Sequence, residues 1–288
     1  MNAQELYKKM DIDFEIDRFT DSWPGFDLGG YMDDNFKKRQ MGLALDNAEE
    51  IKKVYTAVFP SDEVIQRILD SKEENILLFT HHPMVWELKM DGFPFKNFDH
   101  AKLPLMKEKK ISFYALHVPL DNNGEYSTSV SYAKAIGIEK EGDFAPYGGG
   151  MAGVIGRTEA KSISDLAEIV RLAVGHEVKI FNYASDEIKD QKVAVVAGGG
   201  NDMDALNDML QMGINTYVTG SVAVTNYPPT IEFAKTVKEK NINVIAATHY
   251  STEKFACLNM CKYFEKLGIS CEFLDDEPNM FDMGQETF

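Results

Sequence analysis

The sequence predicts an α/β protein in which buried strands alternate with helices. Short apolar runs occur at residues 76–79, 111–116, 193–197 and 244–247, and each is short enough to be a buried strand. A loop and then a helical pattern follow the last three of these runs, which is typical of a strand–loop–helix unit. Ligands of open α/β sheets bind at the carboxyl ends of the strands, so functional residues are expected just after each run.

Composition indicates an ordinary globular protein. The chain has 288 residues, of which 44% are hydrophobic and 26% charged, enough for one large domain or two moderate ones. No stretch resembles a transmembrane helix, and the N-terminus lacks signal-peptide character, so a soluble, cytoplasmic protein that does not bind membranes is expected. Three nearby cysteines, Cys257, Cys261 and Cys271, make a poor disulfide framework and suit a reducing compartment.

The charge excludes one class of partner. A net charge of −16 and the lack of a basic cluster argue against nucleic acid as the principal partner. A phosphorylated small molecule is still compatible with this surface if a metal ion supplies local positive charge. Most of the negative charge is expected to serve solubility.

The first quarter of the chain leads to a pair of histidines. Helical spacing predicts a helix over residues 47–59, and Ser61 is a predicted N-cap for a second helix that runs to Leu69. The strand at 76–79 is followed by His81 and His82, whose side chains can converge only where the strand stops. They are either metal ligands, since neutral imidazole is the commonest ligand side chain, or ordinary polar residues at a strand edge.

A second strand delivers similar residues. Residues 84–105 are predicted to form a long loop of the kind that often covers a binding site, with His100 on its surface. The strand at 111–116 ends in His117, with Asp121 four residues on, and a helix is expected from about Ser127. The same pattern after two strands is a more specific signal for a binding site than the pattern after either strand alone.

The middle of the chain is rich in glycine. Residues 148–150 are interpreted as a turn or lobe junction, because no Gly-Lys-Ser/Thr follows them as in a phosphate-binding loop. A helix from Ser164 to about Gly175 is expected next. The glycines at 198–200 lie between a strand and a helix, so they could hold an anion or simply form a tight turn. A strand at 216–218 and a helix at 228–238 complete this part.

The last strand carries a second possible ligand pair. His249 and Glu253 follow residues 244–247 and are four apart, so one turn of helix brings them to the same side, where they can chelate an ion. The alternative is a solvated helix start in which Glu253 is favoured by the helix dipole. Cys257 and Cys261 share this helix and are interpreted as core residues.

Together these positions predict a metal site. The candidate residues are all nitrogen or oxygen donors and each follows a predicted strand: His81, His82, His117, Asp121, His249 and Glu253. Such a set suits Zn, Mn, Fe or Co. It exceeds what one ion needs, whereas two ions bridged by a carboxylate would use the whole set, as in metallohydrolases that activate a bridging water.

The order of these motifs resembles the NIF-three family of dinuclear-metal proteins, whose members are often labelled GTP cyclohydrolase 1 type 2 homologues. The motifs that carry the resemblance run from His81 and His82 through the His117 to Asp121 segment and Thr219 to His249 and Glu253. The resemblance implies two divalent ions per subunit, held by a set in which Glu253 bridges: His81, His82, Asp121, His249 and Glu253. It places His117 beside the site, as an auxiliary ligand or a support for the ligands, and we assign Glu253 and His117 as the catalytic candidates.

The resemblance also implies an architecture of two intertwined α/β lobes, with mixed sheets flanked by helices, assembled into a homohexamer. We expect the metal-binding lobe at residues 1–140 plus 241–288, and the second lobe at 141–240. Two positions depart from the family pattern. Thr248 stands where the family usually has glycine, and residues 221–225 lack the acidic residue and histidine that commonly follow the Thr-Gly pair.

Three functions are compatible with the sequence. The first is a metal-dependent hydrolase, cyclohydrolase-like or phosphoesterase-like, that acts on a small phosphorylated or nucleotide-like substrate. The second is a non-catalytic regulator, metallochaperone or scaffold ring, which predicts exchangeable metal and no turnover. The third is a nucleotide-binding module built on the glycine loops, which predicts nucleotide binding that survives chelation.

Overall fold

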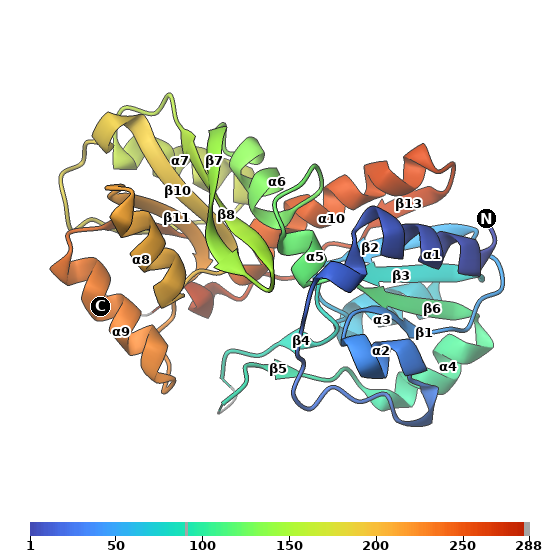
Figure 1. Cartoon of the computed structure of the whole chain (residues 1–288). Helices are drawn as coiled ribbons and strands as arrows, with labels where there is room; N and C mark the ends of the chain where they lie inside the picture. The colour runs from blue at the N-terminus through green and yellow to red at the C-terminus, as the bar shows by residue number, and fades with distance from the viewer. Residues whose placement is uncertain (90–91, 285–288) are drawn as a thin grey trace. The chain divides into compact units, whose positions relative to one another are not determined.

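The computed structural model describes residues 1–89 and 92–284, which form two compact units (Figure 1). Unit 1 comprises Met1–Leu120 and Cys257–Asp276, and unit 2 comprises Asp121–Ala256 and Glu277–Phe288. Each unit has an α/β core of its own, in line with the predicted fold class. The chain therefore passes between units after Leu120, Ala256 and Asp276, whereas the sequence predicted changes only near 140 and 240.

Unit 1 is built on a mixed sheet with the strand order β1-β6-β3-β2-β13 among the described residues. β2, β3, β6 and β13 are parallel, and β1 lies antiparallel at one edge. Strand residues of the three inner strands are almost entirely buried, which explains their continuous apolar runs. The strands are β1 (Gly42–Leu45), β2 (Lys53–Ala57), β3 (Ile76–Thr80), β6 (Ile111–Ala115) and β13 (Ser270–Phe273).

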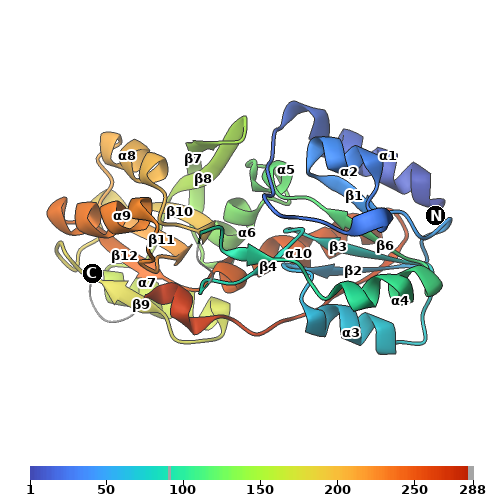
Figure 2. The same cartoon turned by 90° about the horizontal axis from the view of Figure 1, so that it is seen from below.

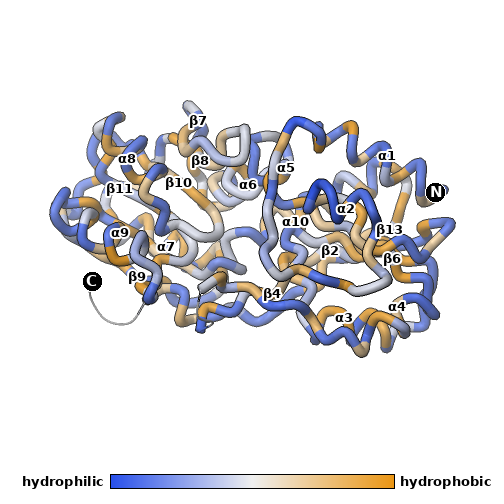
Figure 3. Tube along the Cα trace, turned by 60° about the horizontal axis from the view of Figure 1, so that its bottom comes forward, coloured by the Kyte–Doolittle hydropathy of each residue, from blue (hydrophilic) through white to orange (hydrophobic). Residues whose placement is uncertain are grey.

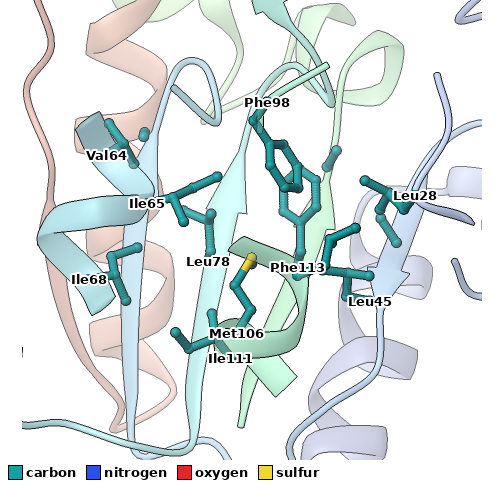
Figure 4. Close-up of a cluster of buried hydrophobic side chains, with 14 of the residues drawn as sticks. Leu28, Leu45, Val64, Ile65, Ile68, Leu78, Phe98, Met106, Ile111 and Phe113 are labelled. Carbon is teal, nitrogen blue, oxygen red and sulfur yellow. The ribbon is translucent and has the colours of Figure 1, made fainter. Parts of the chain in front are cut away.

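Helices cover both faces of this sheet. One face packs in a hydrophobic cluster with α2 (Asp34–Arg39), α3 (Asp62–Asp70) and α4 (Leu103–Glu108). Figure 4 shows the centre of this cluster, where Phe113 and Leu78 of the sheet lie with Ile65 and Met106 of the helices. The opposite face contacts α1 (Ala3–Asp13) and α10 (His249–Lys266), and it does so through the ring pairs Tyr7–Tyr114 and Phe79–Phe264.

The predicted helix over residues 47–59 is wrong, because these residues contain strand β2. Val54, Tyr55 and Thr56 are β-branched or aromatic and pair on both sides, with β3 and with β13. Pairing with β13, which is distant in sequence, is not visible in a local pattern. The helix after Ser61 is confirmed, since the Ser61 side chain accepts a hydrogen bond from the Val64 amide.

The predicted loop at 84–105 contains regular structure. A short antiparallel hairpin pairs β4 (Val85–Trp86) with β5 (Phe95–Lys96), and the chain then leads into α4. Residues 90–91 of this segment lie outside the described residues. His100 is exposed, as expected.

Unit 2 is built on a larger mixed sheet, with the order β7-β8-β10-β11-β12-β9 among the residues described. β10, β11 and β12 are parallel, while β8, β7 and β9 run antiparallel to their neighbours. The glycines at 148–149 form the turn between β7 and β8 with positive φ angles, which confirms the turn interpretation. The strands are β7 (Glu139–Tyr147), β8 (Gly150–Arg157), β9 (Lys179–Phe181), β10 (Lys192–Gly199), β11 (Thr216–Ser221) and β12 (Asn243–Ala246).

This sheet is also covered on both faces (Figure 2). α6 (Thr128–Ala135) and α7 (Ile163–Val174) pack on one face, and α8 (Met203–Gln211) and α9 (Pro228–Glu239) on the other. The cap of α7 is Ser162, two residues before the predicted Ser164. In Figure 3 the helices alternate between hydrophobic and hydrophilic residues, as expected for helices with one face against a sheet.

Helix α10 is shared by the two units. Its first turns, from His249 to Ala256, belong to unit 2, and the remainder from Cys257 belongs to unit 1. Short connections complete the chain, namely α5 (Val118–Asp121) and 3-10 turns such as η5 (Met280–Met283). Within the described part of the chain, no helix combines the length and apolar character needed to cross a membrane.

Candidate metal centre

The adjacent histidines lie where β3 ends. The His81 and His82 amides donate to the carbonyls of Ala57 and Val58, which continues the pairing with β2 past the last strand residue. The imidazole rings are buried, with centroids 4.3 Å apart. His81 Nδ1 lies 3.1 Å from the Leu116 carbonyl oxygen, to which it can donate only as Nδ1–H. In that tautomer Nε2 carries the lone pair that a metal ion requires.

His117 joins this pair because β6 lies next to β3. Thr80 and Ala115 are register partners in these parallel strands, so His81, His82 and His117 all leave the sheet at the same edge. The His117 ring centroid is 5.0 Å from that of His81 and 4.7 Å from that of His82. One nitrogen of each ring lies within 4.8 Å of the others. These three residues form the histidine cluster of unit 1, a spacing at which imidazoles can share an ion.

A carboxylate that the sequence did not reveal orients His117. Asp21 Oδ2 lies 3.1 Å from His117 Nδ1 and accepts a second hydrogen bond from Trp23 Nε1 at 3.0 Å. Burial alone would raise the pKa of the Asp21 carboxyl, but the His117 charge and hydrogen bond, with donors from Trp23 and Ser22, lower it. Asp21 precedes His117 by 96 residues in a segment with only turn signals, so no sequence pattern points to it.

Aromatic rings surround the same cluster. Phe59 and Phe95 stack on His82 with centroids at 4.8 and 5.2 Å, and Trp23 meets His117 edge-on at 4.8 Å. Phe95 belongs to the hairpin in the segment that sequence analysis expected to cover a site. The rings exclude water from one side of the histidines and limit their rotation, which favours a defined ligand geometry.

Unit 2 brings His249 and Glu253 together at the start of α10. His249 Nε2 lies 3.1 Å from Glu253 Oε1, and both side chains are about 95% buried, being 5% and 4% exposed. The Asp282 carboxylate accepts a 2.8 Å hydrogen bond from the His249 amide at the helix N-terminus. The predicted four-residue spacing thus produces a contact, and burial rules out the alternative of a solvated helix start.

The glycine loop after β10 makes room for this pair. Gly198 has a φ of +79°, and a Cβ there would lie 2.1 Å from Glu253 Oε1 and 3.2 Å from His249 Nε2. The Gly198 amide donates to Thr252 Oγ1, and the Gly200 amide donates to the Ser221 carbonyl. Because these two amides already donate to acceptors within the protein, they are not available to bind an anion. The loop therefore acts as a tight βα turn that packs closely against His249 and Glu253.

Asp121, the first residue of unit 2, adds a second carboxylate close to that of Glu253. Its carboxylate accepts a 2.8 Å hydrogen bond from the Thr128 hydroxyl at the start of α6, and the residue is 8% exposed. A carboxylate oxygen of Asp121 lies within 4.8 Å of one of Glu253. Two buried carboxylates at this distance repel each other unless positive charge lies nearby.

The donor chemistry fits metal binding. Among the described residues, the groups whose donor atoms lie close enough to share an ion consist of histidines and carboxylates, without a cysteine. The Glu253 carboxylate also occupies the space that a side chain at position 198 would need. The molecule therefore contains buried His and Glu groups that could hold a metal ion.

Comparison with known proteins supplies the family. The model of Duf34/NIF3 (NGG1p interacting factor 3) matches residues 33–279, which include the six residues predicted as the site. The chain belongs to the DUF34/NIF3 family. The matched range begins after Asp21 and Trp23, so the residues that orient His117 lie outside it.

Named relatives of this NIF3-family chain match most of its length. It is 28% identical over 270 residues to the GTP cyclohydrolase 1 type 2 homolog of Archaeoglobus fulgidus, covering 92% of this chain and 98% of the relative. It is 29% identical over 241 residues to the protein of the same name from Methanocaldococcus jannaschii, covering 82% of this chain and 87% of the relative.

Solved structures share the fold. Protein ybgI, described as of unknown function, has a TM-score of 0.74 at 19% identity over 97% of this NIF3-family chain and 100% of its own. Reduced HcgD from Methanocaldococcus jannaschii has a TM-score of 0.67 at 22% identity, covering 96% and 98% of the two chains.

Proposed function

We propose that this chain binds two divalent metal ions per subunit and is a metal-dependent hydrolase. The ligands would be His81, His82, Asp121, His249 and Glu253, with Glu253 bridging the two ions and His117 beside them. The observation that carries the proposal is the convergence of the buried His81 and His82 with the partly buried His117 at the carboxyl ends of two neighbouring parallel strands. The mixed nitrogen and oxygen set suits Zn, Fe, Mn or Co.

The buried residues can each contribute a step of hydrolysis. Two divalent ions, when bound, would neutralise the carboxylates, polarise a substrate oxygen and bring a coordinated water to a pKa near neutral. Asp21 holds the Nδ1 proton of His117, so Nε2 of His117 can accept a proton at the site. Glu253, fixed between Gly198 and His249, offers a carboxylate that can bridge or accept a proton.

A small phosphorylated or nucleotide-like molecule is the proposed substrate class. The net charge of −16 disfavours such an anion over the protein as a whole, and the proposed ions would supply positive charge at the site. Relatives carry the name GTP cyclohydrolase 1 type 2 homolog, and ring opening of a nucleotide is therefore the first reaction to test. We also propose a homohexamer as the assembly, which sedimentation or native mass spectrometry would measure.

Elemental analysis of the purified chain is the deciding experiment. About two transition-metal ions per chain are expected after loading with manganese, iron or zinc. One ion or none after each loading would contradict the paired site. Metal that exchanges readily without turnover of phosphate esters or cyclic amides would instead support a metallochaperone or scaffold.

The variant Glu253→Gln tests the bridging role. The amide keeps the shape of the side chain but loses its charge, so metal content should fall below that of the wild type and turnover should be lost. Glu265→Gln, an exposed change on the same helix, is the matched control and should alter neither. Full metal content and turnover in Glu253→Gln, with unchanged circular dichroism, would remove Glu253 from the site.

A further inference from the structure

A pair of cysteines in unit 1 does not belong to the proposed set of metal ligands. Cys261 is on α10, eight residues after Glu253, and Cys271 is on the edge strand β13. The S–H group of Cys271 donates to Cys261 Sγ at 2.9 Å, although the two residues are ten positions apart. Neither thiol is fully buried. The prediction that both Cys257 and Cys261 belong to the core is therefore right for Cys257 and wrong for Cys261.

The fold holds the two thiols together. β13 pairs with β2 in parallel register, which places Cys271 opposite Val54. The hydroxyl of Thr56, on the same face of β2, lies 3.3 Å from Cys261 Sγ. α10 is fixed over this face because Thr56 also donates to the Cys257 carbonyl at 3.0 Å. The thiols thus meet without displacement of either element.

Cys257 provides an internal contrast. It lies one helical turn before Cys261, is fully buried, and donates its S–H to the Ala57 carbonyl at 3.2 Å. A buried thiol with a carbonyl acceptor has no stabilised thiolate and no access to reagents. Of the three cysteines, Cys261 and Cys271 alone are both mutually close and accessible.

We propose that Cys261 and Cys271 form a reversible disulfide, making this a thiol–disulfide redox site in addition to the metal centre. The oxidant is a low-molecular-weight disulfide such as glutathione disulfide. The Cys261 thiolate attacks one sulfur of the reagent and releases one thiol. Cys271, after loss of its proton, then attacks Cys261 Sγ and releases the second. The protein dithiol gives up two electrons and two protons, and the reagent gains them as two thiols.

The electrostatic surroundings indicate which thiol reacts first. The hydrogen bond donated by Cys271 and the hydrogen bond shared with Thr56 lower the pKa of the Cys261 thiol, although burial and the charges of Glu265 and Glu272 oppose this effect. The hydrogen bond to Cys261 and burial raise the pKa of Cys271, which keeps its proton until the exchange begins. Cys261 is therefore the attacking residue and Cys271 the resolving one.

The bond would close a short loop that joins the end of α10 to the edge of the sheet. Such a cross-link restricts the unfolded chain, so the oxidised protein should unfold at a higher temperature than the reduced protein. In a reducing compartment the dithiol is the resting form, and the disulfide forms when the ratio of oxidised to reduced glutathione rises.

Intact-mass analysis of the full-length protein tests the proposal. After incubation with glutathione disulfide and alkylation of remaining thiols, the wild type should lose two hydrogen atoms in mass and retain one alkylated cysteine. Non-reducing digestion should give one cross-linked peptide pair containing Cys261 and Cys271, and dithiothreitol should abolish it. The proposed metal ligands take no part in this reaction, so protein treated with a chelator should form the same cross-link.

Serine variants provide the controls. Cys257→Ser should still form the cross-link, and its unfolding temperature should rise on oxidation. Cys261→Ser and Cys271→Ser should show neither effect. A wild type that acquires glutathione adducts without the internal cross-link, or one cross-linked through Cys257, would overturn the proposal. Mapping of the wild-type protein decides the matter even if a variant folds poorly.

Discussion

Gly198 matters because of the side chain it lacks. Its backbone adopts a left-handed conformation, and a Cβ would overlap Glu253 Oε1 at 2.1 Å. We expect Gly198→Ala to displace Glu253 and to lower metal content, and the backbone strain should add a loss of about 1–2 kcal/mol in the free energy of unfolding. Metal per chain by elemental analysis and denaturant titration measure the two effects.

Gly213 is a matched control for this prediction. It has a similar φ of +71° but no atom within 4 Å of the position its Cβ would take. Gly213→Ala should share the conformational cost and leave metal content unchanged. An equal loss of metal in both variants would attribute the effect to strain and would contradict a role for the close approach to Glu253.

Asp21 is predicted to act through His117. Asp21→Asn removes the charge that fixes the Nδ1 proton of His117, and loss of such an orienting partner weakens metal affinity about 10–100-fold. Competition with a chromogenic chelator measures that affinity. Asp27→Asn, an exposed change in the same segment, should have no effect. Unchanged affinity in Asp21→Asn would mean that ring packing alone orients His117.

At the level of elements, the start of α10 depends on a residue from the other end of unit 2. The buried carboxylate of Asp282 accepts the His249 amide at 2.8 Å, as an N-cap side chain would. Asp282→Ala should reduce the free energy of unfolding by about 1–2 kcal/mol. Urea denaturation is the measurement, and Asp204→Ala, at an exposed position of α8, should change it by less than about 0.5 kcal/mol.

Elements defined by local pattern were predictable, and those defined by distant partners were not. The strands before His81, His117 and His249 were recognisable because buried parallel strands are continuously apolar. The apolar residues of β2 also fit helical spacing, and its partner β13 is distant in sequence, so the local pattern favours a helix over the observed strand. The pairing of β4 with β5 leaves no recognisable sequence pattern because each of these strands has only two residues.

The same distinction applies to the candidate site. The histidines and acidic residues at strand ends are recognisable in the sequence because each follows an apolar run within a few residues. Asp21, Trp23 and Gly198 were not, because each is close to a candidate ligand only after folding. Whether the five predicted ligands share two ions remains a prediction for elemental analysis.

For the whole molecule, metal removal should reduce stability. An ion that binds only the folded state stabilises it, and its removal leaves buried carboxylates and histidines uncompensated. Chelation of the metal-loaded protein should lower the midpoint of thermal unfolding by several degrees, roughly as expected for a change of a few kcal/mol. Re-addition of the ion should restore it. Protein that loses its metal without any change in midpoint would contradict a buried, charge-compensating site.

The path of the chain between units has a consequence for biosynthesis. Unit 1 takes its edge strand β13 and most of α10 from residues 257–276, whereas the strands they pack on are made from residues 42–115. During translation, β2 therefore emerges long before its outer neighbour exists and presents an unpaired edge to solvent or to a chaperone. Completion of unit 1 must wait until unit 2 is nearly finished, so the later half of the coding sequence sets when the earlier half can fold.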